Sequence, residues 1–206
     1  MNYEQNLLAE MRHRVTNDLA LIVGMLETER RYCSVLTADE ALDNAVGALM
    51  SLTIYYRRLY ETASEVDLLE LDQHLESVVN GLRNAYLNRL GVTVDCRFET
   101  VLASPVMARD LGLIIVELVA NAAKHAFANH GGRVGVELCD TAEGLVCRVS
   151  DDGCGLDAMA SGRTGGGLAV ASRLAAHLGG SLEVGRSPRW RGAAFVVKIP
   201  WGPDAS

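Results

Sequence analysis

Three segments in the second half of the chain, one polar and two rich in glycine, constrain its fold most. They are Glu117–His125, Asp151–Gly155 and Thr164–Leu168. The first segment has helical spacing, so the carboxylate of Glu117, the amide of Asn121 and the cation of Lys124 lie on neighbouring turns. The second reads as the end of a strand and the third as the start of another helix. Together they can supply a metal ligand, a carboxylate that reads a base, and a phosphate cradle. This combination indicates a nucleotide site of neither the Walker nor the Rossmann type.

The expected helix around Asn121 carries the chemistry that a metal-bound phosphate needs. Mg²⁺ prefers oxygen ligands and usually takes only one or two of them from the protein. Asn121 offers an amide oxygen without adding negative charge beside a triphosphate. Glu117 can order or deprotonate a metal-bound water, and Lys124 can reach phosphate. The alternative is an amphipathic helix whose polar side has no chemical role.

The other two segments favour the nucleotide site over that alternative. A carboxylate at Asp151 can accept a hydrogen bond from an exocyclic amine such as N6 of adenine, and Gly153 and Gly155 allow close backbone approach and positive φ. Unpaired N–H groups at the start of the last helix attract phosphate. The candidates there are Thr164, Gly165, Gly166, Gly167 and Leu168. A plain turn or loop explains each segment alone, but not all three in this order.

The first third of the chain predicts two long helices. It has no proline and a single glycine before Gly47, and its apolar residues recur at steps of three and four. The first stripe consists of Leu8, Met11, Val15, Leu19, Ile22 and Leu26. A capping box over 37–40 starts a second helix, which gives an antiparallel hairpin. Because a lone hairpin cannot cover its own apolar stripe, we predict a dimeric four-helix bundle.

From about residue 64 onward the pattern predicts a different architecture. Helices and strands alternate in the order α-β-α-β-β-α-β-β. The expected helices are 71–90, 105–129 and 167–178, and the expected strands are 92–98, 133–139, 145–150, 181–186 and 193–199. This order indicates an α+β sandwich, with helices layered on one face of a mixed sheet. We therefore expect a helical domain at 1–66 and a sandwich domain at 67–206.

Bulk properties exclude several classes of protein. The chain has 206 residues, 49% of them apolar, and a net charge of −7, which argues against nucleic acid as the main partner. No apolar run approaches the roughly 18–20 residues of a membrane span, and the start lacks the order of a signal peptide. The five cysteines are odd in number and show no C-x-x-C spacing, so we expect free thiols and a cytoplasmic location.

The three segments resemble the nucleotide-binding boxes of histidine kinases. The string E-L-V-A-N-A-A-K-H-A-F, which starts at Glu117, resembles their N box. Residues 151–155 resemble the G1 box and residues 164–168 the G2 box. The resemblance implies the Bergerat or GHKL ATPase fold that is shared with DNA gyrase. It also implies that Asn121 binds Mg²⁺, that Asp151 binds the adenine of ATP, and that the G2 glycines hold phosphate beneath a lid over 156–165.

A second motif surrounds His13 on the first expected helix. His13 lies off the apolar seam, so helical geometry points its imidazole toward solvent. With an ordinary pKa of about 6.5, enough of the imidazole is neutral near pH 7 to attack a γ-phosphoryl group. Asn17, one turn further on, can position that phosphate or a hydrolytic water. The alternative is a surface histidine on a charged helix.

The string H-R-V-x-N-D-L resembles the H box of the HisKA_2 group of histidine kinases, which is related to the HWE group. The resemblance implies a homodimer that phosphorylates His13 with ATP and passes the group to an aspartate on the receiver domain of a response regulator. Arg14 stands where many kinases carry an acidic residue, so the base that serves His13 is not identified. No sensor domain fits ahead of His13, so we expect either a core fragment or input from a separate sensor chain.

Two other functions stay open from the sequence alone. A phosphorelay intermediate or a phosphatase would keep the hairpin with a kinase-like fold, and a phosphatase would use Asn17 to direct water. An ATPase clamp of the gyrase type would use Glu117 as its base, but it leaves the H box unexplained. The input signal, the cognate regulator and the choice between cis and trans phosphorylation are also open.

Overall fold

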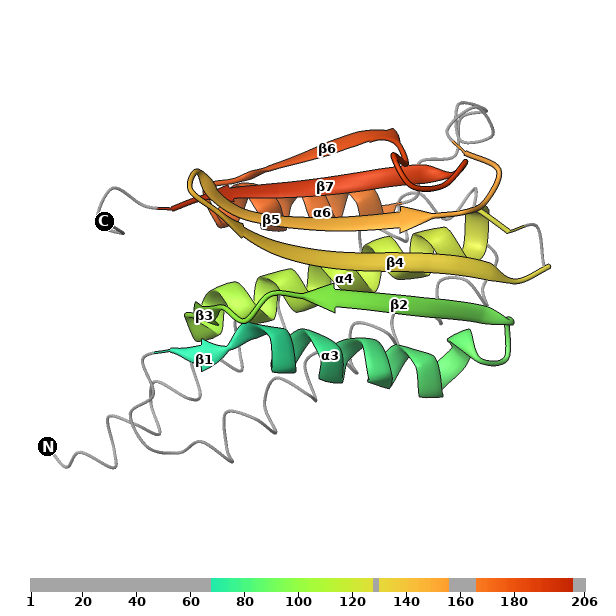
Figure 1. Cartoon of the computed structure of the whole chain (residues 1–206), viewed down its shortest axis with the longest axis horizontal. Helices are drawn as coiled ribbons and strands as arrows, with labels where there is room; N and C mark the ends of the chain where they lie inside the picture. The colour runs from blue at the N-terminus through green and yellow to red at the C-terminus, as the bar shows by residue number, and fades with distance from the viewer. Residues whose placement is uncertain (1–67, 128–129, 156–165, 202–206) are drawn as a thin grey trace, which may run out of the picture.

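The computed structural model of this chain describes residues 68–127, 130–155 and 166–201 (Figure 1). The predicted helical hairpin lies outside these residues, and so do its candidate residues His13 and Asn17. The predicted lid lies outside as well, together with Thr164 and Gly165. The fold described below is therefore that of the expected sandwich domain.

Five strands form a mixed sheet in the order β2-β4-β5-β7-β6. Their bounds are β2 Val92–Phe98, β4 Gly132–Thr141, β5 Gly144–Asp151, β6 Ser181–Arg186 and β7 Ala193–Pro200. β2 runs parallel to β4, and every other neighbouring pair is antiparallel. The strands alternate as expected of a sheet with one buried face: Val134, Val136 and Leu138 of β4 are fully buried.

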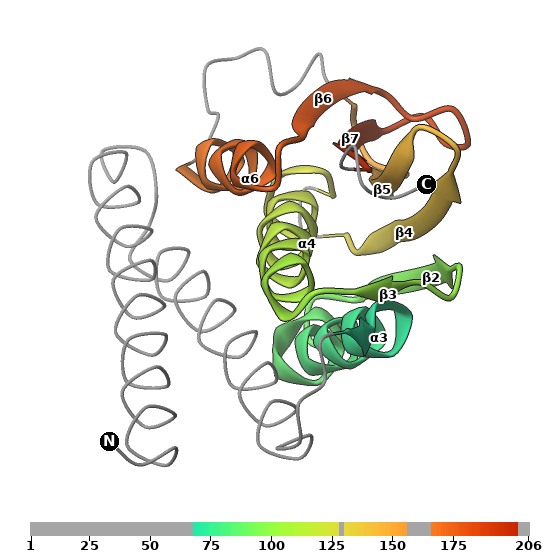
Figure 2. The ribbon, with the colours of Figure 1, turned by 90° about the vertical axis from the view of Figure 1, so that its left-hand side faces the viewer.

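Three helices cover one face of this sheet. They are α3 Leu71–Leu82, α4 Pro105–His125 and α6 Gly166–His177. Figure 2 shows them as a single layer against the sheet, with α4 in the middle. Helix α4 starts where proline and an N-cap predict it, because Pro105 is in its first turn and the Ser104 hydroxyl accepts a hydrogen bond of 3.2 Å from the Met107 N–H.

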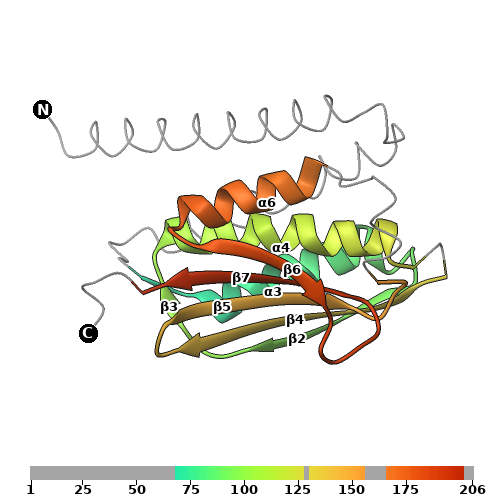
Figure 3. The same ribbon diagram turned by 90° about the horizontal axis from the view of Figure 1, so that it is seen from above.

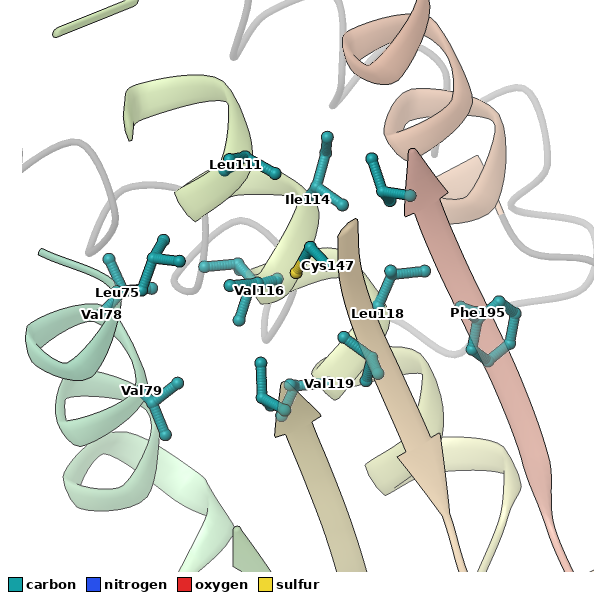
Figure 4. Close-up of a cluster of buried hydrophobic side chains, with 14 of the residues drawn as sticks. Leu75, Val78, Val79, Leu111, Ile114, Val116, Leu118, Val119, Cys147 and Phe195 are labelled. Atoms are coloured by element: carbon teal, nitrogen blue, oxygen red, sulfur yellow. The ribbon is translucent and has the colours of Figure 1, made fainter. Parts of the chain in front are cut away.

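Apolar side chains from both layers meet in one core. Figure 4 shows Leu75 of α3, Ile114 of α4, Cys147 of β5 and Phe195 of β7 among them. All four are essentially inaccessible to water. Nearly every position of α4 between Ala108 and Ala122 is buried, so this helix is held on the sheet side and on both flanks. The α+β sandwich predicted from the sequence is confirmed.

The structure corrects three local expectations. The α-helix predicted over 71–90 ends at Leu82 and continues as a π-helical turn, Arg83–Leu87. At the start of this turn the Arg83 side chain extends to β2, where its guanidinium donates a hydrogen bond of 2.6 Å to the Val94 carbonyl. Helix α4 ends at His125 and not near 129. A second, two-stranded sheet of β1 Leu69–Glu70 and β3 Leu102–Ala103 was not predicted, because two residues carry no periodic signal.

Two further findings concern membranes and cysteines. None of the helices in the described part of the chain combines the length and the apolar character that crossing a bilayer requires. The four described cysteines, Cys96, Cys139, Cys147 and Cys154, are all free thiols. Burial raises the pKa of the Cys147 thiol to about 12, so this core cysteine is chemically inert.

Candidate functional site

The end of β5, the C-terminal half of α4 and the start of α6 converge at one end of the sheet. The Cys154 N–H donates to the Ala126 carbonyl at 3.0 Å, which joins the turn after β5 to the end of α4. Gly167 of α6 lies against the Glu117 carboxylate of α4. Figure 3 shows α4 and α6 running side by side over the sheet. The three elements that carry the predicted boxes therefore meet in space.

Asp151 is the best-defined polar group at this convergence. It is the last residue of β5 and only 2% exposed. Its Oδ1 accepts hydrogen bonds from the Gly153 N–H at 3.0 Å and from the Ala193 N–H at 3.2 Å. Among the described residues, no donor is bonded to Oδ2. One carboxylate oxygen thus fixes the group, and the other is an acceptor for a ligand.

The neighbouring carboxylate has a different task. Asp152 accepts from the Arg133 backbone N–H at 2.7 Å and from the Arg133 Nε at 3.1 Å. It therefore ties the end of β5 to the beginning of β4, on the exposed side of the sheet. Asp152 is thus engaged in a structural contact, and Asp151, the residue predicted from the sequence to read the base, has a different environment.

Burial governs the electrostatics of Asp151. Desolvation raises the pKa of its carboxyl above the ordinary value, and the two backbone N–H groups partly offset that rise. The nearby Asp152 charge adds to the increase. A buried acceptor of this kind gains from a ligand that brings its own N–H donor, because an unmatched polar group in the interior is costly.

Three glycines allow close backbone approach at the end of β5. Gly153 and Gly155 are expected from the sequence, and Gly192 is not. A Cβ on Gly153 would collide with the Ala126 carbonyl, and Gly155 has a φ of +76°. A Cβ on Gly192 would collide with the Asp151 side chain and backbone. The sequence places Gly192 only in a turn before the last strand. Nothing in its local pattern indicates that it packs against a residue 41 positions earlier.

Glu117 is buried and does not decorate a solvated helix face. It is 5% exposed, and a Cβ on Gly167 would collide with its Oε2. Gly167 is the second residue of α6, so the carboxylate lies at the N-terminal end of that helix, where the dipole favours negative charge. Glu117 therefore does not belong to a solvated helix face, and its chemical role stays a prediction.

The remaining candidates are placed less tightly. Asn121 is half-buried and lies one turn after Glu117 on the same side of α4. Lys124 belongs to the last turn of α4, and its side chain lies outside the described part. Gly166 begins α6, and the Leu168 side chain packs against the core. The structure thus brings Glu117 together with the start of α6, and Asp151 together with the end of α4.

Two family models match the chain. The model described as "Histidine kinase-, DNA gyrase B-, and HSP90-like ATPase" matches residues 107–203, which include most of α4 and all of β5 and α6. The HisKA_2 model, described as histidine kinase, matches residues 10–86. The first match implies that the part of the chain with α4, β5 and α6 uses ATP.

Curated relatives align with nearly the whole chain. It is 30% identical over 205 residues to the sensor histidine kinase PdtaS of Mycobacterium tuberculosis, an alignment that covers 95% of this chain and 39% of PdtaS. It is 28% identical over 199 residues to blue-light-activated histidine kinase 2 of Erythrobacter litoralis, which covers 93% of this chain and 56% of that protein. The chain therefore spans only 39% to 56% of these relatives' own length.

Solved structures share the fold. The histidine kinase domain of a blue-light-activated kinase from Erythrobacter litoralis superposes with a TM-score of 0.68 at 24% identity, covering 94% of this chain and 90% of that one. The ATP-binding domain of PrrB from Mycobacterium tuberculosis gives a TM-score of 0.53 at 21% identity, covering 68% and 99%. At these identities the likeness shows the fold, and the predicted GHKL-type ATPase fold is confirmed.

The raised pKa of Asp151 predicts a pH-dependent effect of Asp151→Asn. The folded protein holds this proton more tightly than the unfolded chain, whose Asp pKa is about 3.9. The stabilisation of the folded state by the protonated Asp151 carboxyl is complete below that value, and it is lost as the pH rises through the pKa of the folded protein. We expect the stability of Asp151→Asn relative to the native protein to increase from about pH 3 to pH 7, as measured by urea unfolding. A relative stability that decreases over this range would contradict the burial argument.

The Glu117–Gly167 contact predicts a non-additive pair of substitutions. Gly167→Ala should lower the free energy of unfolding by about 1–3 kcal/mol, because the new methyl group displaces the Glu117 carboxylate. The same change made in a Glu117→Ala background should cost much less, which a double-mutant cycle measures. Gly185→Ala is the matched control, since a Cβ there meets no atom within 4 Å. Additive effects at 117 and 167 would show that the two residues do not interact.

Proposed function

This chain belongs to the histidine kinase family of the HisKA_2 type, and we propose that it phosphorylates its own His13 with ATP. The phosphoryl group then passes to an aspartate on the receiver domain of a response regulator. The observation that carries the proposal is the Asp151 carboxylate, with one oxygen fixed by backbone N–H groups and the other available, at the convergence of α4, β5 and α6.

The chain divides into two functional parts in this proposal. Residues 1–66 form the dimerisation and phosphotransfer hairpin, and residues 67–206 form the catalytic and ATP-binding domain. Support comes from the two family matches, which occupy different parts of the chain at 10–86 and 107–203. The HisKA_2 match at 10–86 extends past residue 66 into α3, so the similarity to histidine kinases continues across the proposed boundary.

The residues of the site fit a magnesium-bound adenine nucleotide. Asp151 supplies a buried acceptor for the 6-amino group of adenine, and Asn121 supplies a neutral oxygen ligand for Mg²⁺. The start of α6 at Gly166 and Gly167 supplies backbone N–H groups for phosphate. Thr164 and Gly165, just before α6, and Lys124 complete the proposed set. The metal ion, when bound, neutralises charge on the phosphates.

The proposed reaction is an in-line phosphoryl transfer. A neutral imidazole nitrogen of His13 forms a bond to the γ-phosphorus, the bond from that phosphorus to the β–γ bridging oxygen breaks, and ADP leaves. The imidazole then holds the phosphoryl group until the receiver aspartate attacks it. In this proposal Glu117 of α4, which is buried against the start of α6, holds a water or a proton beside the phosphates.

The partners follow from this reaction. We propose a homodimer through the hairpin, a receiver domain as phosphoryl acceptor, and a separate sensor chain or a further segment as the source of the signal. The curated relatives are named as a sensor histidine kinase and a blue-light-activated histidine kinase, which supports an input signal in this proposal. The use of ATP places the proposed reaction in the cytoplasm.

Labelling with γ-³²P-ATP and Mg²⁺ tests the proposal. The native chain should acquire label that is lost in acid and retained in base, as phosphohistidine is, and His13→Ala should acquire none. Asp151→Asn should label more slowly, because it gives up the charged acceptor for adenine. Label that persists in His13→Ala would refute the assignment. ATP binding without any label would favour a phosphatase or an ATPase clamp, and no ATP binding would favour a phosphorelay protein.

A further inference from the structure

The loop that joins β6 to β7 contains a buried hydroxyl. It spans residues 187–192 and reads Ser-Pro-Arg-Trp-Arg-Gly. Six polar or charged side chains are buried in the described part of the chain, and Ser187 is the one among them that lies in a loop. A buried polar group needs hydrogen-bond partners, because burying it without them is costly. The partners of Ser187 therefore show what this loop holds in place.

Ser187 closes the loop through both its backbone and its side chain. Its N–H donates to the Gly192 carbonyl at 3.0 Å, which joins the two ends of the loop. Its Oγ accepts hydrogen bonds from the Trp190 N–H at 3.0 Å and from the Arg189 N–H at 3.4 Å. A serine followed by proline favours a turn of this kind. The Ser187 hydroxyl therefore sets the course of the backbone across the loop.

The far end of the loop lies against the Asp151 carboxylate. The N–H of Ala193, the first residue of β7, donates to the Asp151 Oδ1 at 3.2 Å. Gly192 packs so closely on Asp151 that a Cβ would collide with the aspartate side chain and backbone. A Cβ on Gly155 would lie 3.2 Å from the Arg191 carbonyl oxygen, so the loop also contacts the turn after β5. A shift of the loop therefore moves a donor to Asp151 and the backbone beside it.

The Trp190 ring anchors the middle of the loop on the face of the sheet opposite the helices. It lies over Gly135 of β4, where a Cβ would meet two ring atoms at 3.0 and 3.1 Å. The guanidinium groups of Arg189 and Arg133 lie 4.9 and 5.8 Å from the ring centroid, within the range of a cation–π interaction. Arg133 also binds the Asp152 carboxylate at 3.1 Å. The loop therefore reaches the end of β5 by a second route.

We propose that residues 187–192 form a clamp loop that positions Asp151 against the nucleotide base, with Ser187 and Trp190 as its positioning residues. This inference rests on the proposed function, because it concerns the base that Asp151 reads. Both residues act through Gly192 and Ala193 and not by contact with the nucleotide. A carboxylate held in one place favours the base whose donor meets it there, whereas a mobile carboxylate loses part of that preference to the cost of ordering. The clamp loop thus determines base specificity.

Isothermal titration of the full chain with ATP and with purine riboside triphosphate, which lacks the 6-amino group, tests this role. Ser187→Ala should reduce the native preference for ATP about fivefold, as expected from the loss of one hydrogen bond, and Trp190→Ala should reduce it in the same direction. Ser187→Thr keeps the hydroxyl and should retain most of the preference. Ser181→Ala is the matched control, because Ser181 is exposed at the other end of β6.

The possible results separate this inference from the proposed function. If the native protein prefers ATP and both Ser187→Ala and Trp190→Ala keep that preference, the inference is overturned and the proposed function stands. Weaker binding of both nucleotides with an unchanged ratio also overturns the inference, because it reveals a purely structural role. If the native protein binds neither nucleotide, or binds both equally, the assignment of Asp151 to the base is overturned together with the inference.

Hydrogen exchange in the nucleotide-free protein tests the clamp loop without ATP. Ser187→Ala and Trp190→Ala should speed exchange of the Ala193 amide about fivefold relative to amides in the middle of β7, because that amide donates to Asp151 only while the loop is held. Ser181→Ala should leave the relative rate unchanged. Circular dichroism verifies that each variant is folded. An unchanged relative rate at Ala193 in both loop variants would overturn the inference whether or not the protein binds ATP.

Discussion

The candidate site depends on one interaction, the pair of hydrogen bonds that the Asp151 Oδ1 accepts from the Gly153 and Ala193 backbone. These bonds join the end of β5, the turn that follows it and the start of β7. They offset the free-energy cost of burying a carboxylate in the interior. Because they hold Oδ1 in place, they also fix the position of Oδ2. The close approach of Gly153 to Ala126 then ties this unit to α4.

Helix α4 links this carboxylate to the rest of the domain. Its apolar sides are covered by the sheet, α3 and α6, so its position is fixed over most of its 21 residues. Asp110 and Glu117 are the two buried carboxylates of this helix in the described part of the chain, and Glu117 lies where the N-terminal end of α6 favours an anion. A nucleotide phosphate that arrives at the same helix end would share that field with Glu117. The two anions therefore make the start of α6 the electrostatic centre of the proposed reaction.

Much of this arrangement could be predicted from local patterns. The strand at 92–98 matches β2 residue for residue, and Pro105 marks the start of α4, because alternation, capping and proline chemistry are properties of neighbouring residues. The contacts of Gly192 and Gly167 could not be predicted, since each packs against a residue more than 40 positions away. The β1–β3 pair could not be predicted because strands of two residues show no periodicity. The change from α-helix to π-helical turn at Arg83 could not be predicted either, since Arg83 bonds to a strand that follows later in the chain.

The central claim is that Asp151 reads the 6-amino group of adenine. Isothermal titration with ATP and with purine riboside triphosphate, which lacks that amine, measures it most directly. The native protein should bind ATP roughly 10- to 100-fold more tightly, as expected for one charge-assisted hydrogen bond, and Asp151→Asn should lose most of this preference. Equal affinities of the native protein for the two nucleotides would contradict the claim.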